Sequence, residues 1–170
     1  MSTKSTTDSS LSFASSMAIL WTRLALSFWV GGAILFVITS VAEQINPAFD
    51  SPIRDQLATI RFPHYYRFGG ICLGVALAGS LFAVLRISTT LRRRMVLVFL
   101  LTLVSTGIMV FDYWNVYVPL QQLITPPGKE RTQEFLALHH QSRIVNQIHL
   151  GVALVAGLIA SWPISVRRDG

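Results

Sequence analysis

The 170-residue chain has a single cysteine, Cys72, and few charged residues, and both shortages narrow what the protein can be. One thiol cannot form an intramolecular disulfide or a cysteine-based metal cluster. Charged residues make up 13% of the chain and hydrophobic residues 52%, with a mean hydropathy of +0.53. Because this leaves too little polar surface to cover a soluble domain, we expect lipid as the surrounding medium.

Motifs of soluble enzymes and of nucleic-acid-binding proteins are also missing. The sequence contains no glycine-rich phosphate loop, no H-E-x-x-H motif and no nucleophile elbow. Asp112 is the only carboxylate placed within apolar sequence. The formal charge of +6 comes from residues that flank apolar stretches rather than from a basic face with aromatics between. We therefore expect no enzyme activity, no cofactor and no nucleic-acid partner.

Four apolar stretches, each about long enough to cross a bilayer, dominate the chain. These stretches contain no charged residue: 24–42, 68–85, 95–111 and 144–166. Since a hydrocarbon core of ~30 Å needs roughly 20 helical residues, the prediction is an all-α, four-helix transmembrane bundle. The predicted helices lie near 17–44, 65–87, 93–119 and 132–165. They form a membrane domain over 17–166, preceded by a disordered polar tail at 1–16 and followed by a C-terminal tail at 167–170.

A short further helix is predicted between the first two membrane helices. Ser51 and Pro52 are typical of a helix start, because proline fits the first helical position. Three apolar side chains then share one face, as in a helix that lies on the membrane surface: Ile53, Leu57 and Ile60. We expect Phe62 and Pro63 to end this interfacial helix.

Lysine and arginine are concentrated on the cytoplasmic side of membrane proteins. When the segments alternate, eight basic residues fall on one side: Lys4, Arg23, Arg86, Arg92, Arg93, Arg94, Arg167 and Arg168. The other side has five, interspersed with acidic residues: Arg54, Arg61, Arg67, Lys129 and Arg131. The sequence therefore predicts a multi-pass protein with both termini in the cytoplasm, located in the cytoplasmic membrane if the protein is bacterial.

Helices in lipid approach one another through small residues, because burial of apolar surface gives no advantage there. The candidate contacts are Gly31, Gly32, Gly70, Gly74, Ala78, Ala153 and Gly157. We expect them to pack the four helices together. Pairing with a second copy of the chain or with another membrane protein is the alternative.

Polar residues gather in the predicted outer halves of the helices. On the fourth helix five of them follow one stripe at ~100° per residue: His139, Ser142, Arg143, Asn146 and His149. An arginine at the bilayer centre costs roughly 2.5 to 3.5 kcal/mol, so the stripe is expected to face the bundle. Asp112 should lie at a similar depth and form an ion pair with Arg143.

These residues predict an outward-facing polar pocket that binds a small polar ligand or an ion. The candidate residues are His139, Ser142, Asn146, Tyr66, Arg143 and Asp112. A structural or accessory subunit without a ligand is the first alternative, and a haem or metal redox protein is the second. His139 and His149 lie ~15 Å apart along one helix and cannot both bind one iron, which disfavours haem.

Four short motifs follow one another along the chain: FWVGG at 28–32, RFPHYYR at 61–67, NVYVP at 115–119 and FLALHHQSRIVN at 135–146. Together they resemble the transmembrane protein 205-like family. The pattern F-x-x-x-H-x-x-S-x-x-x-N falls on Phe135, His139, Ser142 and Asn146, and the pattern F-P-x-Y-Y falls on Phe62, Pro63, Tyr65 and Tyr66. The resemblance implies a four-helix integral membrane protein without an established activity. It does not extend to Asp112, His140, Arg143 or His149.

Overall fold

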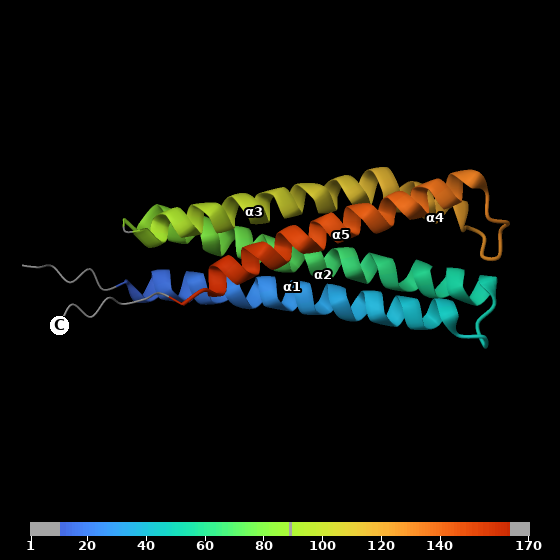
Figure 1. The fold of residues 1–170 in the computed structure, drawn as a ribbon, viewed down its shortest axis with the longest axis horizontal. Helices are drawn as coiled ribbons and strands as arrows, with labels where there is room; N and C mark the ends of the chain where they lie inside the picture. Colours follow the sequence, from blue (N-terminus) through green and yellow to red (C-terminus); the bar gives the residue numbers. More distant parts are fainter. Residues whose placement is uncertain (1–10, 89, 164–170) are drawn as a thin grey trace, which may run out of the picture.

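The computed structural model describes residues 11–88 and 90–163. Its helices form four long columns (Figure 1): α1 (Phe13–Ile45), α2 (Ser51–Arg86), α5 (Gln133–Ser161) and a third column made of α3 (Thr90–Asp112), η1 (Tyr113–Tyr117) and α4 (Val118–Leu123). The predicted fold class, an all-α bundle of four long apolar helices, is confirmed.

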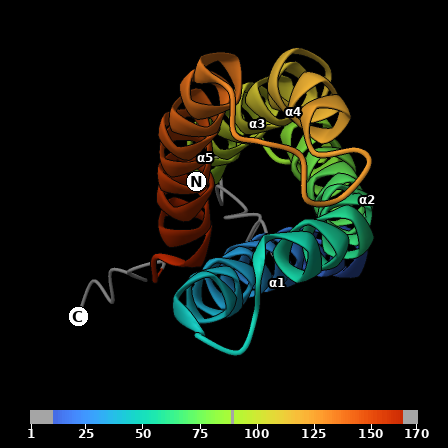
Figure 2. The same ribbon diagram turned by 90° about the vertical axis from the view of Figure 1, so that its right-hand side faces the viewer.

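Successive columns run in opposite directions and pack around a ring (Figure 2). α1 and α3 each contact both α2 and α5. The connections 46–50 and 124–132 lie together at one end of the bundle, which we call the loop end. The opposite end, called the terminal end, contains the short connection from α2 to α3 and the two ends of the described chain.

All four columns are long and apolar enough to cross a membrane, which indicates an integral membrane protein. The helices exceed the thickness of the hydrocarbon layer. The 36 residues of α2 extend about 54 Å at 1.5 Å per residue, compared with ~30 Å for the layer. The uncharged part of α2 lies between Arg67 and Arg86. The segment of α2 before Arg67, which is nearer the loop end, therefore extends beyond the hydrocarbon layer.

The separate interfacial helix is absent from this structure. α2 begins at Ser51, where the Asp50 side chain accepts a hydrogen bond from the Ile53 amide at 3.0 Å, and continues through Pro63 to Arg86. The prediction that Pro63 ends a helix is wrong. Proline removes one backbone hydrogen bond, whereas a helix end leaves several carbonyl and amide groups without partners. At the border of a membrane the continuous helix therefore costs less.

The other helix ends differ more modestly from the prediction. α1 already begins at Phe13, because Ser12 caps it by accepting from the Ser15 amide at 3.3 Å. The third column passes Pro119 and ends at Leu123, by way of the wider π-helical turn of η1. Residues 1–10 of the predicted tail, the end of the predicted fourth helix at 164–165 and the C-terminal tail at 167–170 lie outside the described residues.

Small residues do bring the helices together, but on α2 the predicted set lies on the wrong face. A Cβ atom at Gly74 would have open space around it, and Ala78 is exposed. The close approaches are made by Gly69 and Gly79. A Cβ atom at Gly79 would lie 2.8 Å from the carbonyl oxygen of Ala18 in α1. The glycine pattern alone could not distinguish these two faces, because both carry small residues at helical spacing.

The small residues predicted on α1 and α5 have mixed outcomes. A Cβ atom at Gly32 would lie 2.6 Å from the exposed ring of Phe68, which would have to shift, whereas Gly31 has open space. Ala153 is fully buried, and a Cβ atom at Gly157 would contact Leu26 at 3.7 Å. These contacts between α1, α2 and α5 close one side of the ring.

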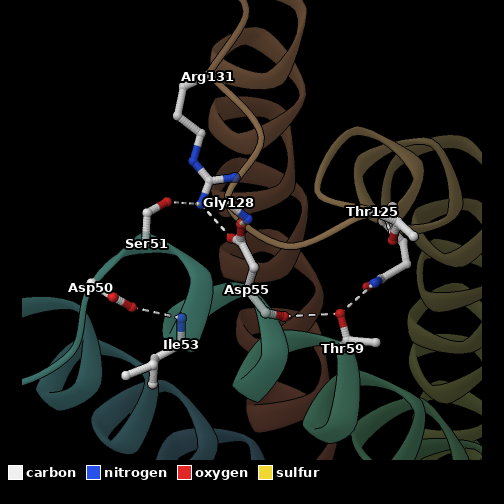
Figure 3. Close-up of polar contacts among 9 residues, drawn as sticks. Asp50, Ser51, Ile53, Asp55, Thr59, Thr125, Gly128 and Arg131 are labelled. Carbon is white, nitrogen blue, oxygen red and sulfur yellow. Dashed lines mark hydrogen bonds and ion pairs between the residues drawn. The ribbon is translucent and has the colours of Figure 1, made fainter.

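Polar contacts tie the loop end together (Figure 3). Asp55 is buried on α2, forms an ion pair with Arg131, and accepts a hydrogen bond from the Gly128 amide at 2.9 Å. Gln121 in α4 donates to the Thr59 hydroxyl at 2.7 Å. The connection 124–132 is therefore fastened to the first turns of α2.

Two arginines secure the terminal end. The Arg23 Nε atom donates to the Ala160 carbonyl at 2.7 Å, and the Arg94 Nε atom donates to the Ile159 carbonyl at 2.6 Å. Carbonyl groups in the last turn of a helix have no partner within the helix, so these contacts satisfy the end of α5. They also connect α5 to α1 and α3.

Candidate functional site

Polar side chains meet inside the bundle where α2, α3 and α5 face one another. At the centre is Asp112, the last residue of α3, which is 2% exposed. Its Oδ2 atom accepts a hydrogen bond from the Tyr66 hydroxyl at 2.5 Å and another from the Asn146 amide nitrogen at 3.4 Å. Asp112 directly follows the uncharged stretch 95–111, so this contact lies near the boundary of the hydrocarbon layer.

The hydrogen bonds continue on both sides of Asn146. The Tyr65 hydroxyl donates to the Asn146 Oδ1 atom at 3.1 Å. The Asn146 amide nitrogen also donates to the Ser142 carbonyl at 3.0 Å and lies 3.3 Å from the Ser142 hydroxyl. We call the five residues Tyr65, Tyr66, Asp112, Ser142 and Asn146 the Asp112 network. It joins three of the four columns.

One oxygen of the central carboxylate has no partner. The Asp112 Oδ1 atom is buried and makes no hydrogen bond within 11–88 and 90–163. The ion pairs found in the same residues join Arg61 to Glu43 and Arg131 to Asp55. A carboxylate that is removed from water and has no cation nearby is energetically costly, so a bound cation or a further hydrogen-bond donor would stabilise Asp112.

Further polar atoms without hydrogen-bond partners lie inside the bundle, about one helical turn closer to the membrane centre than the network. The Trp29 indole contacts the ring of Tyr65 at 5.0 Å and the ring of His149 at 5.4 Å between centroids. His149 is 2% exposed, and its Nε2 atom has no hydrogen-bond partner among the described residues, as is also true of the Trp29 Nε1 atom. Buried polar atoms without partners are uncommon in proteins and often indicate a bound water molecule or ion.

The predicted site residues separate into two groups. Tyr66, Asp112, Ser142 and Asn146 meet in the network. His139 and Arg143 are exposed, and the His139 ring stacks on Phe135 with a centroid distance of 5.7 Å.

The predicted ion pair between Arg143 and Asp112 is not formed among the described residues. Arg143 follows the inward-facing Ser142 by one residue, and one residue turns a helix by ~100°. The predicted stripe was therefore too wide, since Ser142, Asn146 and His149 occupy its inward part.

Sequence reasoning missed Tyr65 and Trp29 as members of the site. Both are aromatic residues, which in membrane helices are expected in the interfacial belt or in the core. The signal that could have identified Tyr65 is its place beside Tyr66 in the F-P-x-Y-Y pattern. Trp29 has a weaker signal in the neighbouring pair Gly31 and Gly32, of which Gly32 lies in close contact with Phe68 of α2 and Gly31 does not.

The described part of the chain contains no group of side chains typical of a metal centre. No three histidine, cysteine, aspartate or glutamate side chains there come close enough to hold a metal ion. His149 is buried against Trp29, whereas His64, His139 and His140 are exposed. These histidines do not form a facing pair for haem.

No protein-family model matches the chain, and no curated protein or solved structure is detectably similar to it.

Proposed function

We propose that this integral membrane protein binds a small monovalent cation, or the ammonium group of a small polar molecule, at Asp112. The observation that carries the proposal is the buried carboxylate with an unpaired Oδ1 atom and no neighbouring basic side chain among the described residues. Ionisable groups within membrane bundles commonly mark ion or substrate sites. The proposal includes no enzymatic step.

The surrounding groups suit a cation. The hydroxyl oxygens of Tyr65, Tyr66 and Ser142 and the amide oxygen of Asn146 accompany the carboxylate in the Asp112 network. Attraction between unit charges is much stronger inside a protein than in water, because the effective dielectric constant is lower. Arg143, which would repel a cation, is exposed and outside the network.

The orientation and the family belong to the same proposal. Placing both termini in the cytoplasm makes the loop end external, so that the site is reached from outside. Arg23, Arg92, Arg93 and Arg94 near the terminal end support this orientation.

Membership of the transmembrane protein 205-like family is supported by the motifs alone. Their Tyr65, Tyr66, Ser142 and Asn146 contribute to the network.

Thermal unfolding of the purified protein tests the cation site. Wild type and Asp112→Asn are compared in detergent with lithium, sodium, potassium, ammonium and methylammonium chloride, using choline chloride to hold ionic strength constant. A cation that binds only the folded state at about 100 times its Kd stabilises it by about 2.7 kcal/mol. We expect at least one of these ions to raise the melting temperature of the wild type, and Asp112→Asn to abolish that rise.

The matched control is Asp50→Asn, which alters a carboxylate at the start of α2 and leaves the network intact. It should keep the ion-dependent rise. An equal rise in wild type and Asp112→Asn, or none in the wild type with any of the five ions, contradicts the proposal.

A structural role is the second candidate, because the network connects α2, α3 and α5 through hydrogen bonds. It predicts that Asn146→Val lowers the melting temperature and that no ion alters the stability of the wild type. Hydrogen bonds between membrane helices contribute about 0.6 kcal/mol each on average. The ion series therefore separates the two candidates.

A further inference from the structure

A groove open to the membrane lies between α2 and the third column, on the far side of Tyr66 from Asp112. It has a volume of about 360 Å³. Its principal lining residues are Tyr66, Arg67, Met109, Val110, Tyr113 and Trp114. The Tyr66 hydroxyl points to the Asp112 network, so this side chain separates the groove from the site described above.

Both walls of the groove contain an irregular helical turn, one in α2 and one in η1. Pro63 lines it from α2 and lacks the amide hydrogen that a regular helix would use there. On the opposite wall, Tyr113 and Trp114 belong to η1, whose π-helical turn is wider than an α-helical turn. The groove therefore lies where an irregular turn of each column faces the other.

The depth of the groove can be derived from α2. Arg67 and Arg86 are the charged residues that bracket its uncharged stretch, and the rise between them is ~28 Å at 1.5 Å per residue, which matches a hydrocarbon layer of ~30 Å. Arg67 therefore lies at the level of the lipid head groups nearest the loop end. Trp114, 64% exposed, is typical of that level.

The groove changes from cationic to apolar along the membrane normal. Arg67 is exposed and makes no ion pair or side-chain hydrogen bond among the residues the structure describes. No acidic side chain lines the groove. About one turn deeper, Met109 and Val110 provide an apolar floor, and Val110 is half exposed.

We propose that this groove is a binding site for an anionic phospholipid, with the phosphate at Arg67 and one acyl chain over Met109 and Val110. The charge at head-group depth and the apolar floor directly below it complement these two parts of one lipid molecule. A guanidinium group can donate two parallel hydrogen bonds to a phosphate, which favours arginine for such contacts. The site is independent of the cation proposed at Asp112.

Lipid binding to the purified full-length protein tests this inference. Delipidated wild type, Arg67→Gln and Arg143→Gln are titrated with phosphatidylglycerol, phosphatidylcholine or inorganic phosphate and followed by native mass spectrometry and melting temperature. Losing a charged hydrogen-bonding partner should weaken phosphatidylglycerol binding about tenfold in Arg67→Gln. Arg143→Gln removes an exposed arginine on α5 away from the groove, and should bind like the wild type.

A second variant tests the apolar part of the site. Val110→Trp fills the floor of the groove from a half-exposed position, so we expect it to fold and to lose phosphatidylglycerol binding. Asp112→Asn should bind the lipid like the wild type. A failure of the proposed cation site can therefore be distinguished from a failure of the proposed lipid site.

Four results would overturn the inference. They are equal affinity for the two lipids, equal losses in Arg67→Gln and Arg143→Gln, stabilisation by inorganic phosphate as large as that by phosphatidylglycerol, and unchanged binding in Val110→Trp. A second copy of the chain seated in the groove, seen as a dimer that phosphatidylglycerol does not dissociate, would also contradict it.

Discussion

At the residue scale, positions one step apart on a helix have opposite surroundings. Ser142 contacts the Asp112 network while Arg143 is exposed, and Gly69 packs against Trp29 while Gly70 is nearly free of contacts. A turn of ~100° per residue is enough to move a side chain from the bundle interior to its surface. The effect of a substitution in this protein therefore depends on helix rotation more than on residue type.

Two glycines of α2 provide a test at this scale. Gly79→Ala would place its Cβ atom 2.5 Å from the Thr22 hydroxyl and 2.8 Å from the Ala18 carbonyl oxygen, and a backbone atom cannot easily move away. We expect a loss of about 1–3 kcal/mol in stability, as in other overpacked interiors. Gly74→Ala should leave the melting temperature unchanged or slightly raised, because its Cβ atom meets open space and alanine favours the helix. Equal melting temperatures of the two variants would contradict the packing of α1 on α2.

At the element scale, α2 is the helix to which the rest of the loop end is attached. It continues through Pro63, and its first turns receive the connection 124–132 through Asp55. Such a connection would otherwise be a long segment without secondary structure, which is usually mobile. The buried carboxylate fixes it by accepting hydrogen bonds from Arg131 and from the Gly128 amide (Figure 3).

Limited proteolysis tests this attachment. Asp55→Ala removes the acceptor for both donors, and we expect the connection to open at a free-energy cost lower by about 1–3 kcal/mol, given that the Arg131 side chain keeps partial access to water. Trypsin cleavage after Lys129 or Arg131 should then accelerate about 5- to 150-fold. Asp50→Ala is the control, since it removes only the cap on Ile53 and should leave the cleavage rate near that of the wild type.

At the scale of the whole molecule, the bundle is longer than the hydrocarbon layer and its two ends differ. The loop end combines acidic and basic residues in ion pairs, such as Arg61 with Glu43, whereas Arg23 and Arg94 cap α5 at the terminal end. The proposed orientation depends on this difference in charged residues between the two ends. The charge bias that orients membrane proteins acts mainly through lysine and arginine in short connections.

Cysteine labelling in intact cells tests the orientation. In a Cys72→Ser background, Glu130→Cys places a thiol in the exposed connection 124–132, and Ser88→Cys places one in the exposed connection between α2 and α3. A membrane-impermeant maleimide should label the first variant in intact cells and the second only after permeabilisation. The opposite result would reverse the orientation. The wild type, whose only cysteine is buried, should stay unlabelled in both conditions.

The amino-acid sequence by itself determined the class, the number of long apolar helices and the region where polar residues gather. Each of these depends on a property of one segment, such as its length and its lack of charge, which exists before any packing. Four of the six candidate residues, namely Tyr66, Asp112, Ser142 and Asn146, lie together as expected from the polar residues in the outer helix halves, and their role in ligand binding stays a prediction.

Only the tertiary structure decided which faces are buried and which partners meet. Tyr66 rather than Arg143 bonds to Asp112, Gly79 rather than Gly74 packs on α1, and α2 continues through Pro63. These outcomes depend on how four helices are rotated against one another, and that rotation is a compromise among all their contacts at once. No single segment contains the information, because every face of these helices carries small or apolar residues.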